Sequence, residues 1–259
     1  MRFCSLGSGS AGNALVIESR SGTTASRVLV DCGFSQRELD ARLARAGLAI
    51  ADFDALFITH EHGDHVGCAL AVSRRHRLPL WTSRGTWRAL GEPALPDGLL
   101  RFARDGEAIV VGNLQLNPFT VPHDALEPLQ LCCTDGQSRL GVLTDAGSST
   151  AHLLDQLQGC DALVLECNHD RTMLAQSRYP ASLKTRIAGP HGHLANESAA
   201  SILAQCHHGG LRHVVAAHLS EQNNSAALAA EALAAACGAQ PSDIVVADAA
   251  TGASWLAMA

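Results

Sequence analysis

The residues with the clearest chemical potential lie together at positions 59–65, which read Thr-His-Glu-His-Gly-Asp-His. His60 and His62 are two positions apart, so an extended loop can aim both imidazoles in one direction. Asp64 and His65 come from the turn that follows. This spacing suits one metal ion held by His60 and His62 and a second held by Asp64 and His65. Zinc, manganese and iron all accept imidazole and carboxylate ligands, so the ligand types leave the metal open.

A polar surface loop is the alternative explanation, because the chain contains 13 histidines and some clustering is expected. The loop, however, directly follows an apolar strand-like run at 55–58, and residues 66–70 begin an expected helix. A strand, a ligand-rich loop and a helix form a rigid frame for side chains that converge on one point. The sequence therefore favours metal binding at this loop.

Three more imidazole or carboxylate groups each follow an apolar strand-like run. They are His123, Asp145 and His218. One such residue alone would more often be a loop cap, but three at equivalent positions favour a site with two metal ions. Asp145 could bridge the ions, because a bridging carboxylate suits two cations about 3.5–4 Å apart, a spacing at which they also share a hydroxide.

Two other stretches beside strand-like runs each have two interpretations. Asp31 ends the run 27–31, where it could support a metal ligand or cap the loop that follows. Residues 7–12 are rich in glycine and serine, like a phosphate-binding loop. They lack the Gly-Lys-Ser/Thr ending of such loops and open a strand instead of a helix. A tight turn beside the site is therefore expected for residues 7–12.

The elements that must position these groups follow from hydrophobic patterning and turn residues. Helices are expected over 36–46, from 66 to about 75, and over 195–205 and 225–237. The middle of the chain is rich in hairpins, whereas strands and helices alternate in the second half. This order fits two sheets packed as a sandwich with helices outside, without an internal linker. Strands are expected over 2–6, 14–18, 27–31, 55–58, 80–82, 108–111, 114–121, 129–134, 139–143, 162–165, 213–217, 244–246 and 253–258.

Composition narrows the classes of function. The formal charge of −6 comes without a long basic tail, so binding to a phosphate backbone would need a local basic patch or the metals themselves. The nine cysteines form no Cys-x-x-Cys pair, which favours reduced thiols in a cytosol. The first residues lack the apolar core of a signal peptide, and no apolar run is long enough to span a bilayer. A cytoplasmic protein without a membrane partner is expected.

The candidate ligands, in their order along the chain, resemble the metallo-β-lactamase superfamily, and the resemblance covers essentially the whole chain. It implies an α/β fold of four layers (αβ/βα), in which two mixed β-sheets are flanked by helices and residues 1–259 form one domain. Four further motifs resemble the YycJ/WalJ-like branch, which is associated with DNA processing, including 5′-to-3′ exonuclease activity. These motifs are residues 5–13, His123-Asp124-Ala125-x-Glu127-Pro128, Glu166-x-Asn168-His169-Asp170 and His218-Leu219-Ser220.

The resemblance also assigns the ligands. It implies two divalent metal ions, zinc or manganese with iron as a further option, and Asp145 as the bridge between them. His62 stands where diiron oxidoreductases of this fold carry glutamate, so hydrolysis is implied instead of redox chemistry. The first ion would be bound by His60, His62 and His123, and the second by Asp64, His65 and His218.

The chain departs from the pattern of that branch at four positions around the site, which bear on substrate recognition and not on the metals. Glycine, an aromatic residue, serine and glutamate are expected there. This chain has Gln130, Leu131, Ala195 and Gln222 instead.

Two residues are candidates for proton transfer. His193 resembles a histidine that assists at the scissile phosphate in tRNA-processing nucleases of this fold, and a role at the entry of a helix is the alternative. Asp64 is expected to accept the proton of the attacking water. Both assignments describe general acid–base catalysis beside a dinuclear site.

Substrate contacts are expected from the segment after the run 162–165. Asn168 and His169 follow this run, and His169 could line the substrate mouth or cap the next helix. A loose basic region lies further on and could track a nucleic-acid backbone, or it could be ordinary surface charge. It contains Arg171, Arg178, Lys184 and Arg186.

The sequence supports three functions. The first is a metal-dependent phosphodiesterase that uses a metal-bridging hydroxide on a nucleic acid, above all DNA. The second is a hydrolase of a small ester, thioester or lactone, which the acidic net charge favours. The third is a non-catalytic metal-binding regulatory module, against which the complete ligand set argues. The short interval between Asp145 and His218 leaves no room for the large inserted domain of the RNA-processing members.

Overall fold

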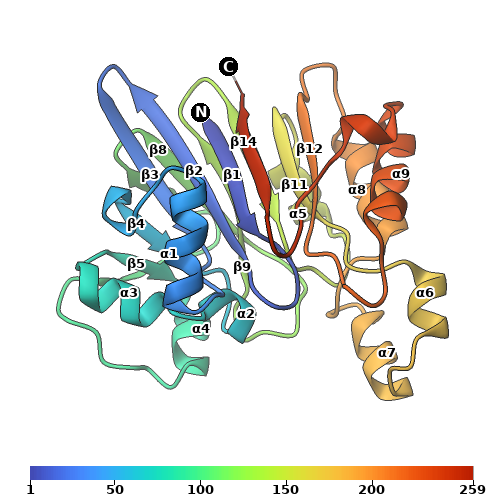
Figure 1. Cartoon of the computed structure of the whole chain (residues 1–259), viewed down its shortest axis with the longest axis horizontal. Coiled ribbons are helices and arrows are strands. Elements are labelled where there is room, and N and C mark those ends of the chain that lie inside the picture. Colours follow the sequence, from blue (N-terminus) through green and yellow to red (C-terminus); the bar gives the residue numbers. More distant parts are fainter. Residues whose placement is uncertain (259) are drawn as a thin grey trace.

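The protein, for which a computed structural model describes residues 1–258, contains two seven-stranded sheets packed face to face (Figure 1). In the first sheet the amino-terminal strands pair in antiparallel fashion, whereas β3, β4, β5 and β6 are parallel. The order of this sheet is β14 (Ala253–Ala257), β1 (Arg2–Gly7), β2 (Ala14–Ser21), β3 (Thr24–Val30), β4 (Ala55–Phe57), β5 (Leu80–Thr82) and β6 (Leu100–Phe102).

The second sheet has the same division. The hairpin strands β7 to β10 are antiparallel, and β10, β11, β12 and β13 are parallel. Its order is β13 (Val245–Val246), β12 (His213–Ala217), β11 (Ala162–Glu166), β10 (Arg139–Leu143), β9 (Leu129–Thr134), β8 (Leu114–Thr120) and β7 (Ile109–Val111). Both sheets are therefore mixed, as expected.

Three apolar clusters hold the layers together. One lies between the sheets, with Phe57 from the first sheet and Leu116 from the second. A second packs α5 (Ala151–Leu157), α8 (Asn196–Cys206) and α9 (Ala226–Cys237) on the second sheet. A third packs α1 (Gln36–Arg45) and α3 (Ala69–His76) on the first sheet. This order of helix, sheet, sheet and helix confirms the four-layer sandwich that the sequence predicted.

The alternation of strand residues explains these layers. Leu15 and Ile17 of β2 face the cluster between the sheets, whereas Val16 between them faces the helices. The same alternation places Val142 of β10 inside and Leu143 outside. Because side chains alternate across a strand, apolar residues at successive positions produce a sheet that is buried on both faces.

The expected helix from residue 66 to about 75 is two helices in the structure. The first is α2 (Gly63–Val66) and the second is α3, and Gly67 separates them with φ of 36°. A β-carbon on Gly67 would lie 2.3 Å from the carbonyl oxygen of Cys32, so only glycine allows this close approach. This turn packs the segment after the 59–65 loop closely against the backbone that follows β3.

Several short elements were not expected from the sequence. They are too short to produce a helical or strand period that could be recognised. No helix within residues 1–258 has the length and apolar character needed to cross a membrane. The unexpected elements are α4 (Arg84–Ala89), β6, α5 and α7 (Ala181–Ile187), whereas the helix expected after His169 is α6 (Arg171–Gln176).

The sheet order brings the candidate residues to one edge of the sandwich. The strands β4, β8, β10, β11 and β12 all end at this edge, because β8 and β10 are both antiparallel to β9. Each strand is followed by a loop that carries a candidate ligand or a carboxylate. The short helices α2, α4, α6 and α7 lie at this edge, which is the lower one in Figure 1.

Candidate metal centre

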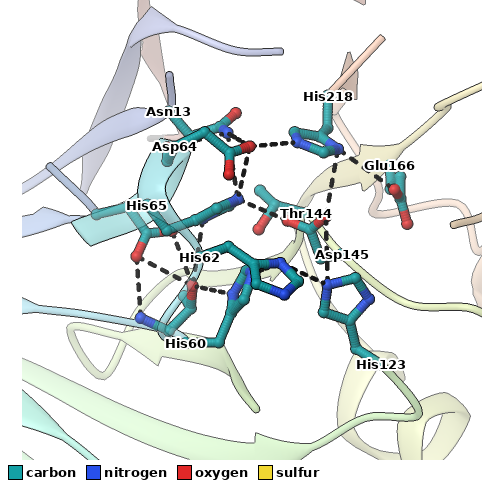
Figure 2. Close-up of polar contacts among 12 residues, drawn as sticks. Asn13, His60, His62, Asp64, His65, His123, Thr144, Asp145, Glu166 and His218 are labelled. Atoms are coloured by element: carbon teal, nitrogen blue, oxygen red, sulfur yellow. Dashed lines mark hydrogen bonds and ion pairs between the residues drawn. The ribbon is translucent and has the colours of Figure 1, made fainter. Parts of the chain in front are cut away.

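The first cluster consists of three imidazoles from two loops. The Nδ1 atom of His62 lies 3.1 Å from Nε2 of His60 and 3.3 Å from Nε2 of His123. Ligand atoms of a tetrahedral zinc ion, each about 2.0–2.1 Å from the metal, lie about 3.3 Å from one another. The three nitrogen atoms therefore have the mutual spacing of one metal-binding face (Figure 2).

The second cluster combines two imidazoles with a carboxylate. The Oδ2 atom of Asp64 lies 3.3 Å from Nε2 of His218 and 3.6 Å from Nε2 of His65. All three ligand atoms lie close enough together to hold one ion. The loop 59–65 thus contributes to both clusters, and the two halves of the chain meet here, because His218 comes from the end of β12.

Asp145 lies between the two clusters. It is buried, and among the described residues only imidazole nitrogens contact its oxygens. Its Oδ2 atom is 2.9 Å from Nε2 of His65, and its Oδ1 atom is 3.1 Å from Nδ1 of His193. Imidazoles can exchange a proton for a metal ion, so a buried carboxylate that they surround is suited to a cation site. The position between the clusters fits a carboxylate that bridges two ions.

The ligands of the loop are held by a buried carboxylate at the end of β3. The Asp31 carboxylate accepts hydrogen bonds from the backbone N–H of Thr59 at 2.9 Å and from Nδ1 of His65 at 2.7 Å. The Thr59 hydroxyl also lies 3.0 Å from Nδ1 of His60. Of its two interpretations, the contacts favour support of a candidate ligand: Asp31 holds the start of the 59–65 loop and orients His65, leaving its Nε2 atom for an ion, and residues 32–35 donate no hydrogen bond to its carboxylate.

Residues 7–12 form a tight turn beside the site, and Asn13 connects it to the ligands. The Asn13 amide donates to the backbone carbonyl of Asp64 at 3.3 Å and lies 3.2 Å from Nε2 of His65. The Ser8 hydroxyl accepts from the backbone N–H of His218 at 2.8 Å. His218 has φ of 55°, an unusual conformation for a non-glycine residue that this bond stabilises.

His123 is oriented by a distant backbone group. Its Nδ1 atom donates to the carbonyl oxygen of Gly192 at 2.9 Å, which leaves Nε2 unprotonated for an ion. Gly147 lets this loop approach, because a β-carbon there would lie 2.4 Å from the backbone of Pro190 and Gly192. The segments that follow β8, β10 and β11 are therefore in contact with one another, through His123, Gly147 and Gly192.

The electrostatics of the site favour positive charge. Burial lowers the pKa of His65, but the charges of Asp31 and Asp145 outweigh it and raise that pKa to about 10. Burial also opposes protonation of His218, yet Asp145 and neighbouring carboxylates raise its pKa to about 10. The same field attracts metal cations, so metal binding would displace protons from these rings.

The cluster around His60 differs. Burial and then the charge of His65 hold the pKa of His60 well below its usual value. Burial likewise lowers the pKa of His123. Neutral imidazoles are the form that binds a metal, so His60 and His123 are already in their ligand state near neutral pH.

A carboxylate–histidine pair borders the centre. Nδ1 of His193 lies 2.7 Å from Oε1 of Glu166 and 3.1 Å from Oδ1 of Asp145. Burial lowers the pKa of His193, but Glu166 and Asp145 raise it to about 11. The backbone N–H groups of Ala146 and Leu194 donate to Oε2 of Glu166 at 2.8 and 3.2 Å. Glu166 is thus fixed, and it orients the ring of His193.

The predicted substrate residues lie on the side of the centre formed by α6 and α7. Asn168 is buried and donates to the carbonyl oxygen of His218 at 3.1 Å, so it supports a candidate ligand. Arg186 pairs with Asp124 at 2.5 Å on the rim. Asp170 caps α6 by accepting from Met173, so the capping role considered for His169 belongs to its neighbour.

The sequence motif contains Glu166 but does not predict its role. Its position directly after the apolar run 162–165, like that of the other strand-end groups, is the feature that indicates a place in the site. At one departure from the branch pattern, Ala195 begins α8 without the side-chain cap that a serine would provide. At another, Gln130 accepts a hydrogen bond from the backbone N–H of Thr144 at 3.0 Å.

Comparison with known proteins identifies relatives over most of the chain. The family described as "Beta-lactamase superfamily domain" matches residues 26–219, which include all seven candidate ligands. Exodeoxyribonuclease YycJ of Bacillus anthracis is 34% identical over 231 residues, which cover 88% of this chain and 86% of that protein. Exodeoxyribonuclease WalJ of Streptococcus pneumoniae is 28% identical over 232 residues, or 88% of this chain and 85% of that protein.

The fold itself has solved counterparts. The metallo-β-lactamase fold protein YhfI from Bacillus subtilis superposes with a TM-score of 0.73. The superposition covers 99% of each chain at 14% sequence identity. At this identity the likeness concerns the fold, and it agrees with the four layers described above.

Proposed function

Because the chain belongs to the metallo-β-lactamase superfamily, in its YycJ/WalJ-like branch, we propose that it is a dinuclear phosphodiesterase that degrades DNA. Membership of this family makes it a metal-dependent hydrolase. The names of the two exodeoxyribonuclease relatives support DNA as the substrate and removal of nucleotides from an end as the mode of action. The absence of any disulfide among the nine cysteines agrees with a cytoplasmic location, which is also part of the proposal.

The observation that carries the proposal is the buried carboxylate of Asp145, which only imidazoles contact within residues 1–258 and which lies between two complete ligand clusters. A single ion could be bound by one cluster only, and the ligand atoms of the other cluster would then bind no ion. Two ions would use both clusters and both oxygens of Asp145. When bound, two divalent ions supply a hydroxide nucleophile at neutral pH and offset the charge of phosphate oxygens.

His193 is proposed to deliver a proton to the leaving oxygen. Its Nδ1 atom faces Glu166, and its Nε2 atom has no partner within residues 1–258, so that nitrogen is available to a substrate. Glu166 keeps the ring in one orientation and stabilises its protonated form. His193 is partly exposed, as a residue that contacts substrate must be.

Asp64 is proposed to accept a proton in addition to binding an ion. Its side chain is the more exposed of the two carboxylates in the centre, with 23% of its surface accessible against 1% for Asp145. A carboxylate at the open side of the clusters is accessible to the attacking water. Asp145, enclosed by imidazoles, is restricted to holding the ions.

The test is hydrolysis of 5′-phosphorylated duplex DNA by purified protein with added manganese or zinc. His62→Ala and Asp145→Ala are expected to abolish the activity. His76→Ala is the matched control, because His76 is an exposed residue at the end of α3, outside the centre. It should retain full activity.

Three outcomes would contradict the proposal. If DNA and RNA stay intact with every metal while a thioester or lactone is cleaved, the protein is a small-molecule hydrolase. If elemental analysis finds no metal in the purified protein and none after reconstitution, both enzymatic functions and the metal-binding regulatory module fail. A stoichiometry of one ion per chain would leave the hydrolase but remove its dinuclear mechanism.

A further inference from the structure

A pocket of about 300 Å³ opens beside the metal centre, between α6 and α7. Each helix contributes one cationic side chain, Arg171 from α6 and Lys184 from α7, beside apolar or small residues. None of the candidate metal ligands lines it. The pocket is formed by His169, Arg171, Leu174, Ala175, Lys184, Thr185 and Ala188.

His169 is the unusual member of this lining. Only 1% of the residue is exposed, and its Nδ1 atom has no hydrogen-bond partner within residues 1–258. The backbone carbonyl of His169 accepts a hydrogen bond from the N–H of Asn196 at 2.9 Å, which anchors this residue at the base of the pocket. Because Nδ1 is enclosed by protein, Nε2 is the ring nitrogen that a group in the pocket can reach.

The two cations of the pocket are held in place with donors to spare. The Lys184 ammonium donates to the carbonyl oxygen of Ala175 at 2.6 Å, and two of its three N–H groups remain available. Arg171 donates to the hydroxyl of Ser198 at 3.2 Å and lies 3.4 Å from Glu197. Glu197 offsets part of the charge of Arg171, so Lys184 provides the stronger attraction for an anion.

The pocket and the metal centre share a wall. Asn168 donates to the carbonyl oxygen of His218, and its own backbone N–H donates to the carbonyl oxygen of Leu194 at 3.0 Å. The next residue is His169. Asn168 and His169 therefore connect the lining of the pocket to the backbone of His218 and Leu194 at the metal centre.

We propose that this pocket binds a phosphodiester group of the substrate strand next to the one that is cleaved. The inference rests on the proposed nuclease function and extends it to a second contact with the strand. Lys184 and Arg171 attract the phosphate, and His169 donates a hydrogen bond to it from the floor. Leu174, with the alanines beside it, contacts the sugar or base. Such an arrangement binds the backbone without reading its sequence.

The first experiment measures binding without catalysis. Fluorescence anisotropy of a labelled single-stranded oligonucleotide in EDTA compares the wild-type protein with Lys184→Ala and His169→Phe. Lys184→Ala should raise Kd about tenfold at low salt and reduce the slope of log Kd against log salt by about 0.7. Lys184→Arg should restore most of the affinity. His169→Phe keeps the ring volume and should weaken binding without a change in the salt slope.

The matched control is Arg20→Ala, which removes one positive charge at the tip of the β2–β3 hairpin, far from the metal centre (Figure 1). It should leave both Kd and the salt slope unchanged. If Arg20→Ala and Lys184→Ala weaken binding equally, the effect is one of net charge and the pocket is not a phosphate site.

The second experiment separates this inference from the proposed function. The substrates are the oligonucleotide and bis(4-nitrophenyl) phosphate, which has a single phosphodiester and nothing to place in the pocket. Lys184→Ala should lower kcat/KM for the oligonucleotide about tenfold more than for the small diester, through KM. Equal losses on both substrates would overturn the pocket and leave the nuclease intact. A wild-type protein that cleaves neither substrate would instead overturn the proposed function.

Discussion

Two buried carboxylates at opposite ends of the strands have opposite surroundings. Glu18 of β2 accepts hydrogen bonds from three guanidinium groups, those of Arg2, Arg20 and Arg27, at 2.6 to 2.7 Å. Asp145, past the end of β10, is contacted by no guanidinium group of the described residues, and the nearest nitrogens are those of His65 at 2.9 Å and His193 at 3.1 Å. The first carboxylate is satisfied by the chain itself, whereas the second has only imidazoles around it. The difference separates a group that stabilises the fold from one that is arranged for a ligand.

The pKa values reflect this contrast. Burial would raise the pKa of Glu18, but the three arginines outweigh it and lower the pKa to about 2. Burial would also raise the pKa of Asp145, and the charges of His218 and His65 hold it well below its usual value. Arginine stays charged at any relevant pH, so the Glu18 cluster is permanent. Imidazoles exchange protons for metal ions, so the charge around Asp145 is replaceable.

The largest effect is expected when the carboxylate of Asp145 is removed. Asp145→Ala takes away the group shared by both clusters, so catalysis should fall at least about 1000-fold and the bound metal should drop below two ions per chain. Steady-state kinetics and elemental analysis measure the two effects. Circular dichroism should show the fold retained. Full metal content with normal activity would show that Asp145 does not bridge the ions.

The satisfied carboxylate should give the reverse result. Glu18→Gln leaves three arginines without their anion, so the free energy of unfolding should fall by about 2–3 kcal/mol. The melting temperature should decrease by roughly 5–10 °C. Catalysis per folded molecule should not change. Glu107→Gln, which breaks an exposed pair with Arg104, is the control and should cost less than about 1 kcal/mol.

Asp31 shares one property with each of these carboxylates. Its oxygens are hydrogen-bonded, as those of Glu18 are, and it contacts the metal centre, as Asp145 does. One of its hydrogen bonds orients His65. Asp31→Asn should weaken metal binding about 10-fold to 100-fold, and the ion in the Asp64 cluster should be lost first. Titration with a chelator measures the two affinities. Equal weakening of both ions would show that Asp31 acts on the whole loop and not through His65.

The smallest expected effect is the pH dependence of the free energy of unfolding that Glu18 contributes. The pKa of Glu18 is lower in the folded chain, at about 2, than in an unfolded chain, where a glutamate titrates near about 4.3. Its stabilisation is therefore complete above the unfolded value and is lost as the pH falls towards 2. In EDTA, the difference in unfolding free energy between wild type and Glu18→Gln should shrink from pH 5 to pH 2. A difference that stays constant over this range would show that Glu18 stabilises by packing alone.

The sequence was sufficient for the fold class and for the side chains that converge as candidate ligands, whose binding of metal stays a prediction. Positions 59–65 carry their signal locally, because four donors within six residues need no tertiary information to be noticed. His123, Asp145 and His218 were recognisable as strand-end residues and by their order. Short elements such as α4 and α7 escaped, because six or seven residues contain too little periodicity and owe their structure to the surface on which they pack.

Some relationships depend on which strands are neighbours. The pairing of Glu166 with His193, the contact of Asp31 with His65 and the contact of Asn13 with Asp64 each join residues that are remote or unremarkable in the sequence. The partners of Glu18 also become apparent only when β1, β2 and β3 lie side by side. Local patterns do not contain this information, because a side chain's neighbours are set by sheet order and register.

The amino-acid sequence predicts a ligand-rich loop, three more candidate ligands at strand ends, their grouping into two clusters beside Asp145 and a two-sheet fold. The distances within the clusters, the burial of Asp145 among imidazoles and the pocket between α6 and α7 are visible only in the folded chain. Residue types and strand periods are encoded locally, whereas convergence arises because β4, β8, β10 and β12 end at one edge, where loops far apart in the chain are packed together.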